Sequence, residues 1–105
     1  MNRKPLTLSV PHKLTQEEAR RRIAAGVEEA RLKHSNDFVG VKETWNGNRM
    51  DFHLGVLGQS ITGRVDVGPD AVMLEVDLPW VFAALAGRAK AQIQEEARKL
   101  LERKP

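Results

Sequence analysis

Residues with side chains suited to catalysis or metal binding are scattered along this sequence. The three histidines, His12, His34 and His53, fall in different segments, with no His-Glu-x-x-His pattern and no close pair that would chelate zinc. The chain contains no cysteine, which excludes disulfides, thiolate ligands and a thiol nucleophile. No serine lies in the Gly-x-Ser-x-Gly turn of a serine hydrolase. We therefore expect a protein that is not an enzyme and has no metal site or cofactor.

Glycine and aromatic patterns give no stronger indication of a ligand. Gly55, Gly58 and Gly63 do not join a strand to a helix N-terminus, where nucleotide phosphates are bound. We interpret them as turn and close-packing glycines, and we expect Trp80 or Phe82 to fill the space beside Gly63. Since the five aromatic residues form no basic-aromatic strand motif, nucleic acid is not an expected partner.

Length and composition indicate one domain, residues 1–105. Hydrophobic residues make up 41% of the chain and charged residues 30%, as in ordinary globular proteins. No apolar stretch approaches the length of a membrane span, and no export signal is recognisable, so we expect a cytoplasmic protein. The formal net charge is +3, and residues 88–104 alone carry six basic and three acidic side chains. If these residues form a helix, its basic side chains either make a solvated face or bind an anionic partner.

The elements that position these residues begin with a strand and a helix. Leu6, Leu8 and Val10 alternate with polar residues, which predicts a half-buried strand that Pro11 ends. The sequence Thr15-Gln16-Glu17-Glu18 then predicts a reciprocal capping box at the start of the first helix. That helix has one apolar stripe, formed by Ala19, Ile23, Val27 and Ala30.

Three turns then separate four extended segments, and each turn predicts a register. Either Asn46-Gly47 or Gly47-Asn48 could be central in the first hairpin, and both place Val39 and Val41 on the inner face. A type II′ turn at Gly58-Gln59 predicts that Phe52 pairs with Val65. The longer turn at residues 68–71 predicts the pairs Val67 with Val72, Val65 with Leu74, and Ile61 with Leu78.

The last segment is predicted to be a second helix that begins at Pro79. Its apolar stripe is Phe82, Leu85, Ala89, Ile93, Ala97 and Leu100, and we expect Phe82, Leu85 and Ile93 to pack on Phe52, Leu54 and Leu74. The predicted fold is α+β, with element order β-α-β-β-β-β-α. A five-stranded antiparallel sheet of spatial order 2-3-4-5-1 carries both helices on one face, similar to a reduced helix-grip arrangement.

The outer face of this sheet is predicted to be charged. In the predicted registers His53, Arg64 and Glu75 form a row, and Asp51 lies directly opposite Asp66. Opposed carboxylates repel one another unless a cation intervenes. We expect compensation by Arg49, Lys42 or Arg64 on a solvated face, rather than a metal site or acid-base chemistry.

Candidate contact residues are one tryptophan and the basic side chains of the second helix. Trp45 lies beside a hairpin end and is equally suited to the edge of the core and to a contact surface. We expect Trp80, by contrast, to pack in the core. The candidate contact surface comprises Trp45, Arg88, Lys90, Arg98, Lys99, Arg103 and Lys104.

Several short motifs, in order along the whole chain, resemble one family. They are Val10-Pro11-His12-Lys13-Leu14, Glu17-Glu18-Ala19, Trp45, Leu57-Gly58-Gln59 with Gly63, and Val76-Asp77-Leu78-Pro79-Trp80. The chain is similar to the polyhydroxyalkanoic acid system proteins, small bacterial proteins associated with storage-polyester granules. The resemblance brings no catalytic residues. It implies a non-enzymatic accessory protein that binds a granule surface or a granule protein.

The sequence is also compatible with two other functions. One is a small carrier that holds an acyl or other apolar ligand between the sheet and the second helix. The other is a regulatory protein that binds an anionic polymer. The sequence also leaves open whether the chain forms a homodimer.

Overall fold

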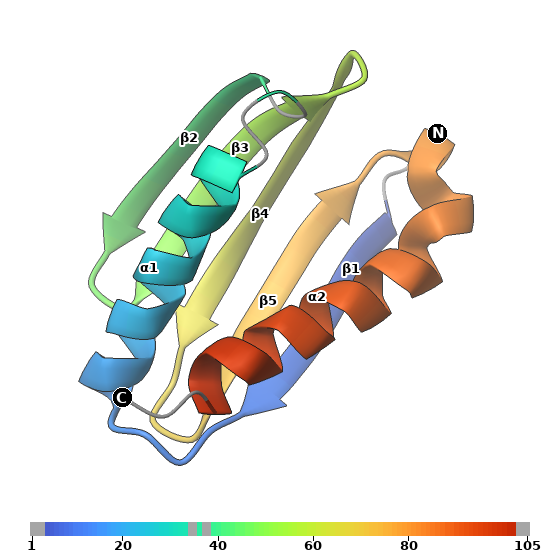
Figure 1. The fold of residues 1–105 in the computed structure, drawn as a ribbon. Helices are drawn as coiled ribbons and strands as arrows, with labels where there is room; N and C mark the ends of the chain where they lie inside the picture. Colours follow the sequence, from blue (N-terminus) through green and yellow to red (C-terminus); the bar gives the residue numbers. More distant parts are fainter. Residues whose placement is uncertain (1–3, 34–35, 37–38, 103–105) are drawn as a thin grey trace.

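The structure is a computed structural model that describes residues 4–33, 36 and 39–102 (Figure 1). Its elements, in chain order, are β1 (Lys4–Pro11), α1 (Gln16–Lys33), β2 (Val39–Asn46), β3 (Arg49–Val56), β4 (Gln59–Val67), β5 (Ala71–Leu78), the 3-10 helix η1 (Trp80–Leu85) and α2 (Ala86–Glu102).

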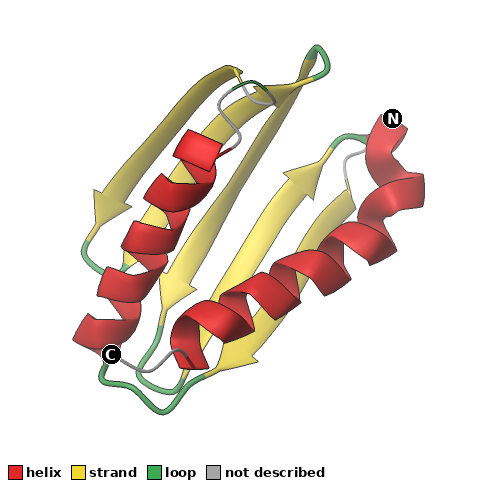
Figure 2. Ribbon diagram, viewed as in Figure 1, coloured by secondary structure: helices red, strands yellow, loops and turns green. Residues whose placement is uncertain are grey.

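The strands form one open antiparallel sheet of order β1-β5-β4-β3-β2. Both helices lie on the same face of this sheet (Figure 2). The predicted α+β class, strand order and helix placement are therefore confirmed. Among the described residues, none forms a layer over the other sheet face (Figure 2).

The core forms between this sheet and the two helices. Its buried side chains are Leu6, Leu8, Val10, Ala19, Ile23, Met50, Val65, Val67, Val72, Val76 and Leu101. The alternating residues of β1 and the first part of the stripe on α1 are buried as predicted. Leu101 in the last turn of α2 is only 3% exposed, although the predicted stripe ended at Leu100.

The observed registers keep the predicted inner face but differ in detail. The pairing of β4 with β5 is confirmed, with Val67 opposite Val72. The pairing of β3 with β4 differs by two residues from the prediction, because Leu57 and Gly58 are the central turn residues and Phe52 pairs with Gly63. Their φ values of 50° and 79° are those of a type I′ turn, which suits the twist of a hairpin better than the arrangement we predicted.

Strand β2 follows one of the two predicted registers and then departs from it. Asn46 pairs with Arg49, so Gly47 and Asn48 form the turn. The register shifts between Val39 and Lys42, at Gly40, whose φ is +61°. This irregularity leaves Val39 70% exposed, so the prediction that Val39 faces inward was wrong.

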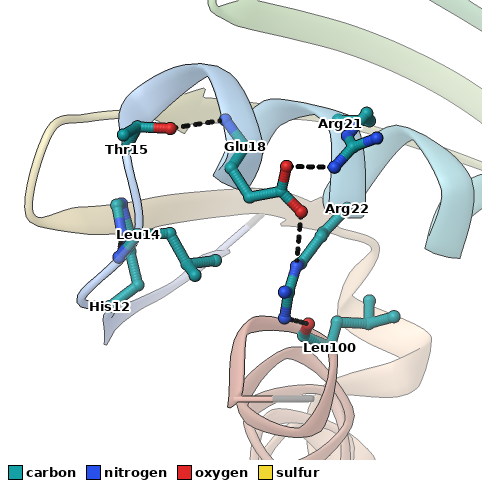
Figure 3. A network of polar contacts seen from close by, with 7 residues as sticks. All are labelled: His12, Leu14, Thr15, Glu18, Arg21, Arg22 and Leu100. Carbon is teal, nitrogen blue, oxygen red and sulfur yellow. Dashed lines mark hydrogen bonds and ion pairs between the residues drawn. The ribbon is translucent and has the colours of Figure 1, made fainter. Parts of the chain in front are cut away.

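The N-terminus of α1 makes half of the predicted capping box. The Glu18 backbone N–H donates to the Thr15 hydroxyl at 3.1 Å, as predicted. The Glu18 carboxylate does not return to Thr15 but accepts hydrogen bonds from Arg21 and Arg22 (Figure 3). Arg22 also donates to the Leu100 carbonyl at 3.3 Å, which joins the start of α1 to the end of α2.

The beginning of the second helix differs most from the prediction. Pro79 precedes a 3-10 helix, which has about three residues per turn instead of 3.6 and therefore rotates the predicted stripe away from the sheet. Trp80 is 63% exposed and Leu85 53% exposed, so the core positions predicted for them were wrong. The space beside Gly63 is filled by the ring of Phe52, not by Trp80 or Phe82.

Within the described residues, no helix has the length and apolar character needed to cross a membrane.

Candidate functional site

Exposed apolar side chains gather at one end of the molecule. The described residues include seven large hydrophobic side chains that are exposed, and six of them form what we call the apolar end: Leu32, Val39, Leu57, Trp80, Val81 and Leu85. They lie at the end of α1, the start of β2, the β3–β4 turn and η1. In Figure 1 these segments lie toward the same end of the strands, the first three near one another and η1 to the right of them beside the end of β5. Met73, the seventh, is on β5 within the sheet.

Local backbone geometry explains why these side chains face solvent. Leu57 occupies a left-handed turn position with φ 50° and is 85% exposed. A branched apolar residue is unusual in this conformation, which favours glycine or asparagine. The backbone of η1 directs Trp80 and Val81 outward after the buried Pro79. The sequence signal that we missed was therefore an apolar residue placed directly in a turn.

The helix ends that border the apolar end are basic. The last turn of α1 carries Arg31 and Lys33, and the first turn of α2 has no acidic residue. Arg88 and Lys90 follow at the start of α2, and both are exposed. Cations beside apolar side chains favour contact with an interface that carries some negative charge.

A groove of about 400 Å³ lies between the two helices and the inner sheet face. Its apolar lining residues are Leu8, Val10, Ile23, Val27, Ala30, Val41, Met50, Phe52, Leu54, Val65, Val72, Leu74, Ile93, Ala97 and Leu100. Ile93 lines this groove together with Phe52, Leu54 and Leu74, on which it was predicted to pack. The inner face is thus only partly covered by the helices.

The helices are close at one end of the groove and separate toward the other. A Cβ atom on Gly26 would overlap the Leu100 side chain, so glycine permits the close approach of α1 and α2. Arg22 adds its hydrogen bond to the Leu100 carbonyl at this junction (Figure 3). From there the two helices diverge toward the apolar end (Figure 1).

An ion pair joins two of the charged residues at the groove rim, Arg31 and Glu43. The Arg31 guanidinium contacts the carboxylates of Glu28 and Glu43, each at 3.3 Å. The Glu43 side chain is 19% exposed, and the Arg31–Glu43 ion pair bridges α1 to the edge strand β2. Lys42 of β2 and Gln92 and Glu96 of α2 complete the polar part of the lining.

The outer sheet face pairs opposite charges. Asp51 lies opposite Arg64, and Asp66 lies opposite Arg49, so the predicted Asp51–Asp66 opposition was wrong. His53 lies opposite Thr62, so the His53–Arg64 half of the predicted row was wrong as well. Arg64 is opposite Glu75 and contacts it at 3.3 Å, so the other half of that row is confirmed. Arg49 contacts Asp51 at 3.3 Å and Arg64 contacts Asp66 at 3.9 Å, which confirms the predicted compensation by arginine. In the part of the chain that the structure describes, no group of three acidic or histidine side chains could hold a metal ion.

His12 contributes to a structural junction at the other end of the sheet. Its Nε2–H donates to the Gly68 carbonyl at 2.9 Å, and its Nδ1 accepts from the Leu14 backbone N–H at 3.1 Å. These partners assign the Nε2-protonated neutral tautomer. The histidine thereby joins the β1–α1 loop to the β4–β5 turn.

The family model described as "Putative polyhydroxyalkanoic acid system protein" matches residues 6–101. The chain belongs to this family. The match extends from β1 to the last turn of α2, which confirms the resemblance found in the sequence. No curated protein and no solved structure matches the chain significantly.

In this member of the polyhydroxyalkanoic acid system family, the predicted contact residues do not form one surface. Trp45 is half-buried against the core, with the Arg20 guanidinium 4.3 Å from its ring centroid. It lies at the end of β2 opposite to Val39, and thus far along the strand from the apolar end. Arg88 and Lys90 border the apolar end at the start of α2.

The remaining predicted contact residues are near the C-terminal end of α2. Lys99 is exposed, whereas Arg98 is held by Glu95 and Glu102, at 3.0 Å from the latter. Hydrogen bonding to Glu95 raises the pKa of Arg98 above its usual range. Arg103 and Lys104 lie outside the described residues.

Proposed function

We propose that the chain is a non-enzymatic accessory protein of polyhydroxyalkanoate metabolism that attaches to the surface of storage-polyester granules through its apolar end. Membership of the polyhydroxyalkanoic acid system family supports the metabolic context. The single observation that carries the mode of attachment is the collection of Leu32, Val39, Leu57, Trp80, Val81 and Leu85 at one end of the molecule.

The distribution of these side chains, more than their number, supports a contact surface. Single exposed hydrophobic residues are normal on soluble proteins, but several at one end are typical of an interaction site. Leu57 at a hairpin tip and Trp80 on η1 could enter an apolar surface without unfolding any element. Tryptophan is well suited to such a boundary, because its ring is apolar while its N–H can remain hydrated.

Charge gives a second, weaker contribution to attachment. Lys33 and Arg88 border the apolar end and would approach any anionic coat on the granule. Exposed charges interact weakly and are screened by salt, so this contribution should fall as the ionic strength rises. Apolar contact would persist in salt.

The test is sedimentation of the chain with isolated granules, both native and stripped of protein. The informative variant is Leu57→Asn, which removes the most exposed leucine but suits the type I′ turn better than leucine does. We expect its attachment to weaken about tenfold or more, since burying one leucine is worth about 1.5–3 kcal/mol. Its thermal stability should be unchanged or higher.

The matched control is Met73→Ser, which removes an exposed hydrophobic side chain outside the apolar end. It should attach like the wild type. Trp45→Ala and Arg98→Gln, which alter predicted contact residues far from the apolar end, should also leave attachment intact when the variants remain folded. If Trp45→Ala abolishes attachment while Leu57→Asn does not, attachment through the apolar end is wrong.

A further inference from the structure

The groove between α1 and α2 shares no lining residue with the apolar end, although it widens toward it, and needs its own explanation. We propose that it binds one uncharged, linear acyl chain, such as the alkyl chain of a hydroxyalkanoate ester. Its lining is almost entirely aliphatic or aromatic, with Phe52 and Leu54 of β3 on the floor and Ile93 of α2 on one wall. This inference goes beyond surface attachment and does not depend on it.

The size of the groove favours a thin occupant over a protein segment. Its volume of about 400 Å³ is within the usual range for small-molecule sites. A helix is about 10 Å across and rises about 5.4 Å per turn, so a single turn would already fill this volume. An extended alkyl chain of about ten to twelve methylene groups, each with roughly the volume of a water molecule, would fit instead. A partner helix or a second copy is therefore a poorer match than an alkyl chain.

The charges at the rim favour an uncharged occupant. The Arg31 guanidinium already forms ion pairs with the carboxylates of Glu28 and Glu43, so its charge does not favour an anionic ligand. The lining carries two cations, Arg31 and Lys42, against two carboxylates, Glu43 and Glu96, so it has no net positive charge that would hold a carboxylate. The amide of Gln92 can donate a hydrogen bond to an ester carbonyl. An ester matches these groups better than a free fatty acid does.

The shape of the groove determines how such a chain would lie. The helices meet where Gly26 approaches Leu100 and diverge toward the apolar end, so the chain would enter from the wider side (Figure 1). Its tail would then lie among Val10, Ile23 and Val72 on the inner sheet face and α1. The polar end of the ester would remain near the rim.

The test uses the complete chain and an NMR titration with methyl hexanoate, methyl octanoate and methyl decanoate. We expect saturable binding whose dissociation constant falls about fourfold for each added methylene, because each buried methylene contributes a constant increment. Decanoate, with its charged head, should bind at least about tenfold more weakly than methyl decanoate. Absence of saturable binding by the wild type, or affinity independent of chain length, would overturn the proposal.

Two variants locate the site. Ala30→Trp places a large side chain at a groove-lining position of α1, whereas Ala25→Trp makes the same change at an exposed position of α1 that does not line the groove. The first should weaken ester binding at least about tenfold, and the second should leave it unchanged. Equal affinity in both variants would show that the esters bind elsewhere.

Two further measurements separate this proposal from its alternatives. Leu57→Asn should retain full ester affinity, so that failure of surface attachment and failure of the groove proposal can be told apart. Sedimentation equilibrium should show a monomer. A dimer that Ala30→Trp dissociates would mean that a second copy occupies the groove, and would refute the acyl site.

Discussion

Two leucines near the ends of the second helical segment give a direct test of how that segment is placed. Leu101 is 3% exposed and packs in the core, whereas Leu85 on η1 is 53% exposed. The sequence pattern alone assigned Leu85 to the core and predicted a large cost for its truncation. The structure predicts the opposite order of destabilisation.

The expected costs follow from the buried fraction of each side chain. Leu101→Ala should lower the free energy of unfolding by about 3 kcal/mol, within the 2–5 kcal/mol usual for large-to-small changes in a core. Leu85 is roughly half buried, so Leu85→Ala should forfeit about half of the transfer free energy of a leucine, or about 1 kcal/mol. Alanine is a good helix former, so propensity adds no further cost.

Urea unfolding followed by circular dichroism would measure both costs, at two protein concentrations to exclude self-association. The slope of the free energy against urea should be unchanged, because each variant exposes the same surface on unfolding as the wild type. If Leu85→Ala costs as much as Leu101→Ala in the monomer, η1 packs on the core and the exposed placement of Trp80 and Leu85 is wrong.

Four other substitutions test local features of the fold. Thr15→Ala removes the N-cap acceptor of α1 and should cost about 1 kcal/mol in urea unfolding, with Thr7→Ala on the outer face of β1 as a control of comparable exposure. Gly63→Ala should be destabilising by about 1–3 kcal/mol, since a Cβ there would lie 2.5 Å from the Glu75 carbonyl oxygen and from the Phe52 ring. Gly87 of α2 has open space around it, so Gly87→Ala should instead raise the free energy of unfolding by about 0.5–1 kcal/mol. A change of the same sign in both glycine variants would contradict the packing described for them. Hydrogen bonds, first from Arg22 and second from Arg21, hold the pKa of Glu18 below its usual 4.5. The ionised Glu18 carboxylate therefore stabilises the fold fully above pH 4.5, and this stabilisation is lost as the pH falls through the lowered folded-state pKa. The stability difference between the wild type and Glu18→Gln should therefore shrink at acid pH, and a constant difference would contradict this role.

The inner face of the sheet could be predicted because its signal is insensitive to register. Side chains alternate with a period of two, so the two-residue error in pairing β3 with β4 left Phe52 and Val65 on the same face. The same error gave the wrong cross-strand neighbours, so Asp51 was predicted to lie opposite Asp66 but lies opposite Arg64. The prediction of faces is thus more robust than the prediction of pairs.

The turn itself could not be assigned from residue type. Leu57-Gly58 and Gly58-Gln59 both contain a glycine, and only the second avoids placing leucine at a positive φ. The observed turn accepts that cost. A sequence pattern based on preferred conformations does not anticipate a residue held in an unfavourable one.

The candidate site was predicted only in part. The basic residues Arg88 and Lys90 were identified, but Trp80 was assigned to the core because a regular helix starting at Pro79 would have turned it inward. The apolar end also depends on which turns meet at the same end of the sheet, and this is a property of topology and not of any one segment. Its members, such as Leu32 and Leu57, are distant in sequence and share no periodic pattern.

The junction at Leu100 makes local stability uneven along the helices. Arg22 and Gly26 hold α1 against α2 at one end of the groove, while the far end of α1 lacks such a junction with α2 in the described residues. Segments with fewer buried contacts open more readily than the rest of a fold. Amide hydrogen exchange should accordingly be slow around Ile23 and faster toward Leu32, and fluctuations of this end of α1 would set the width through which a ligand passes.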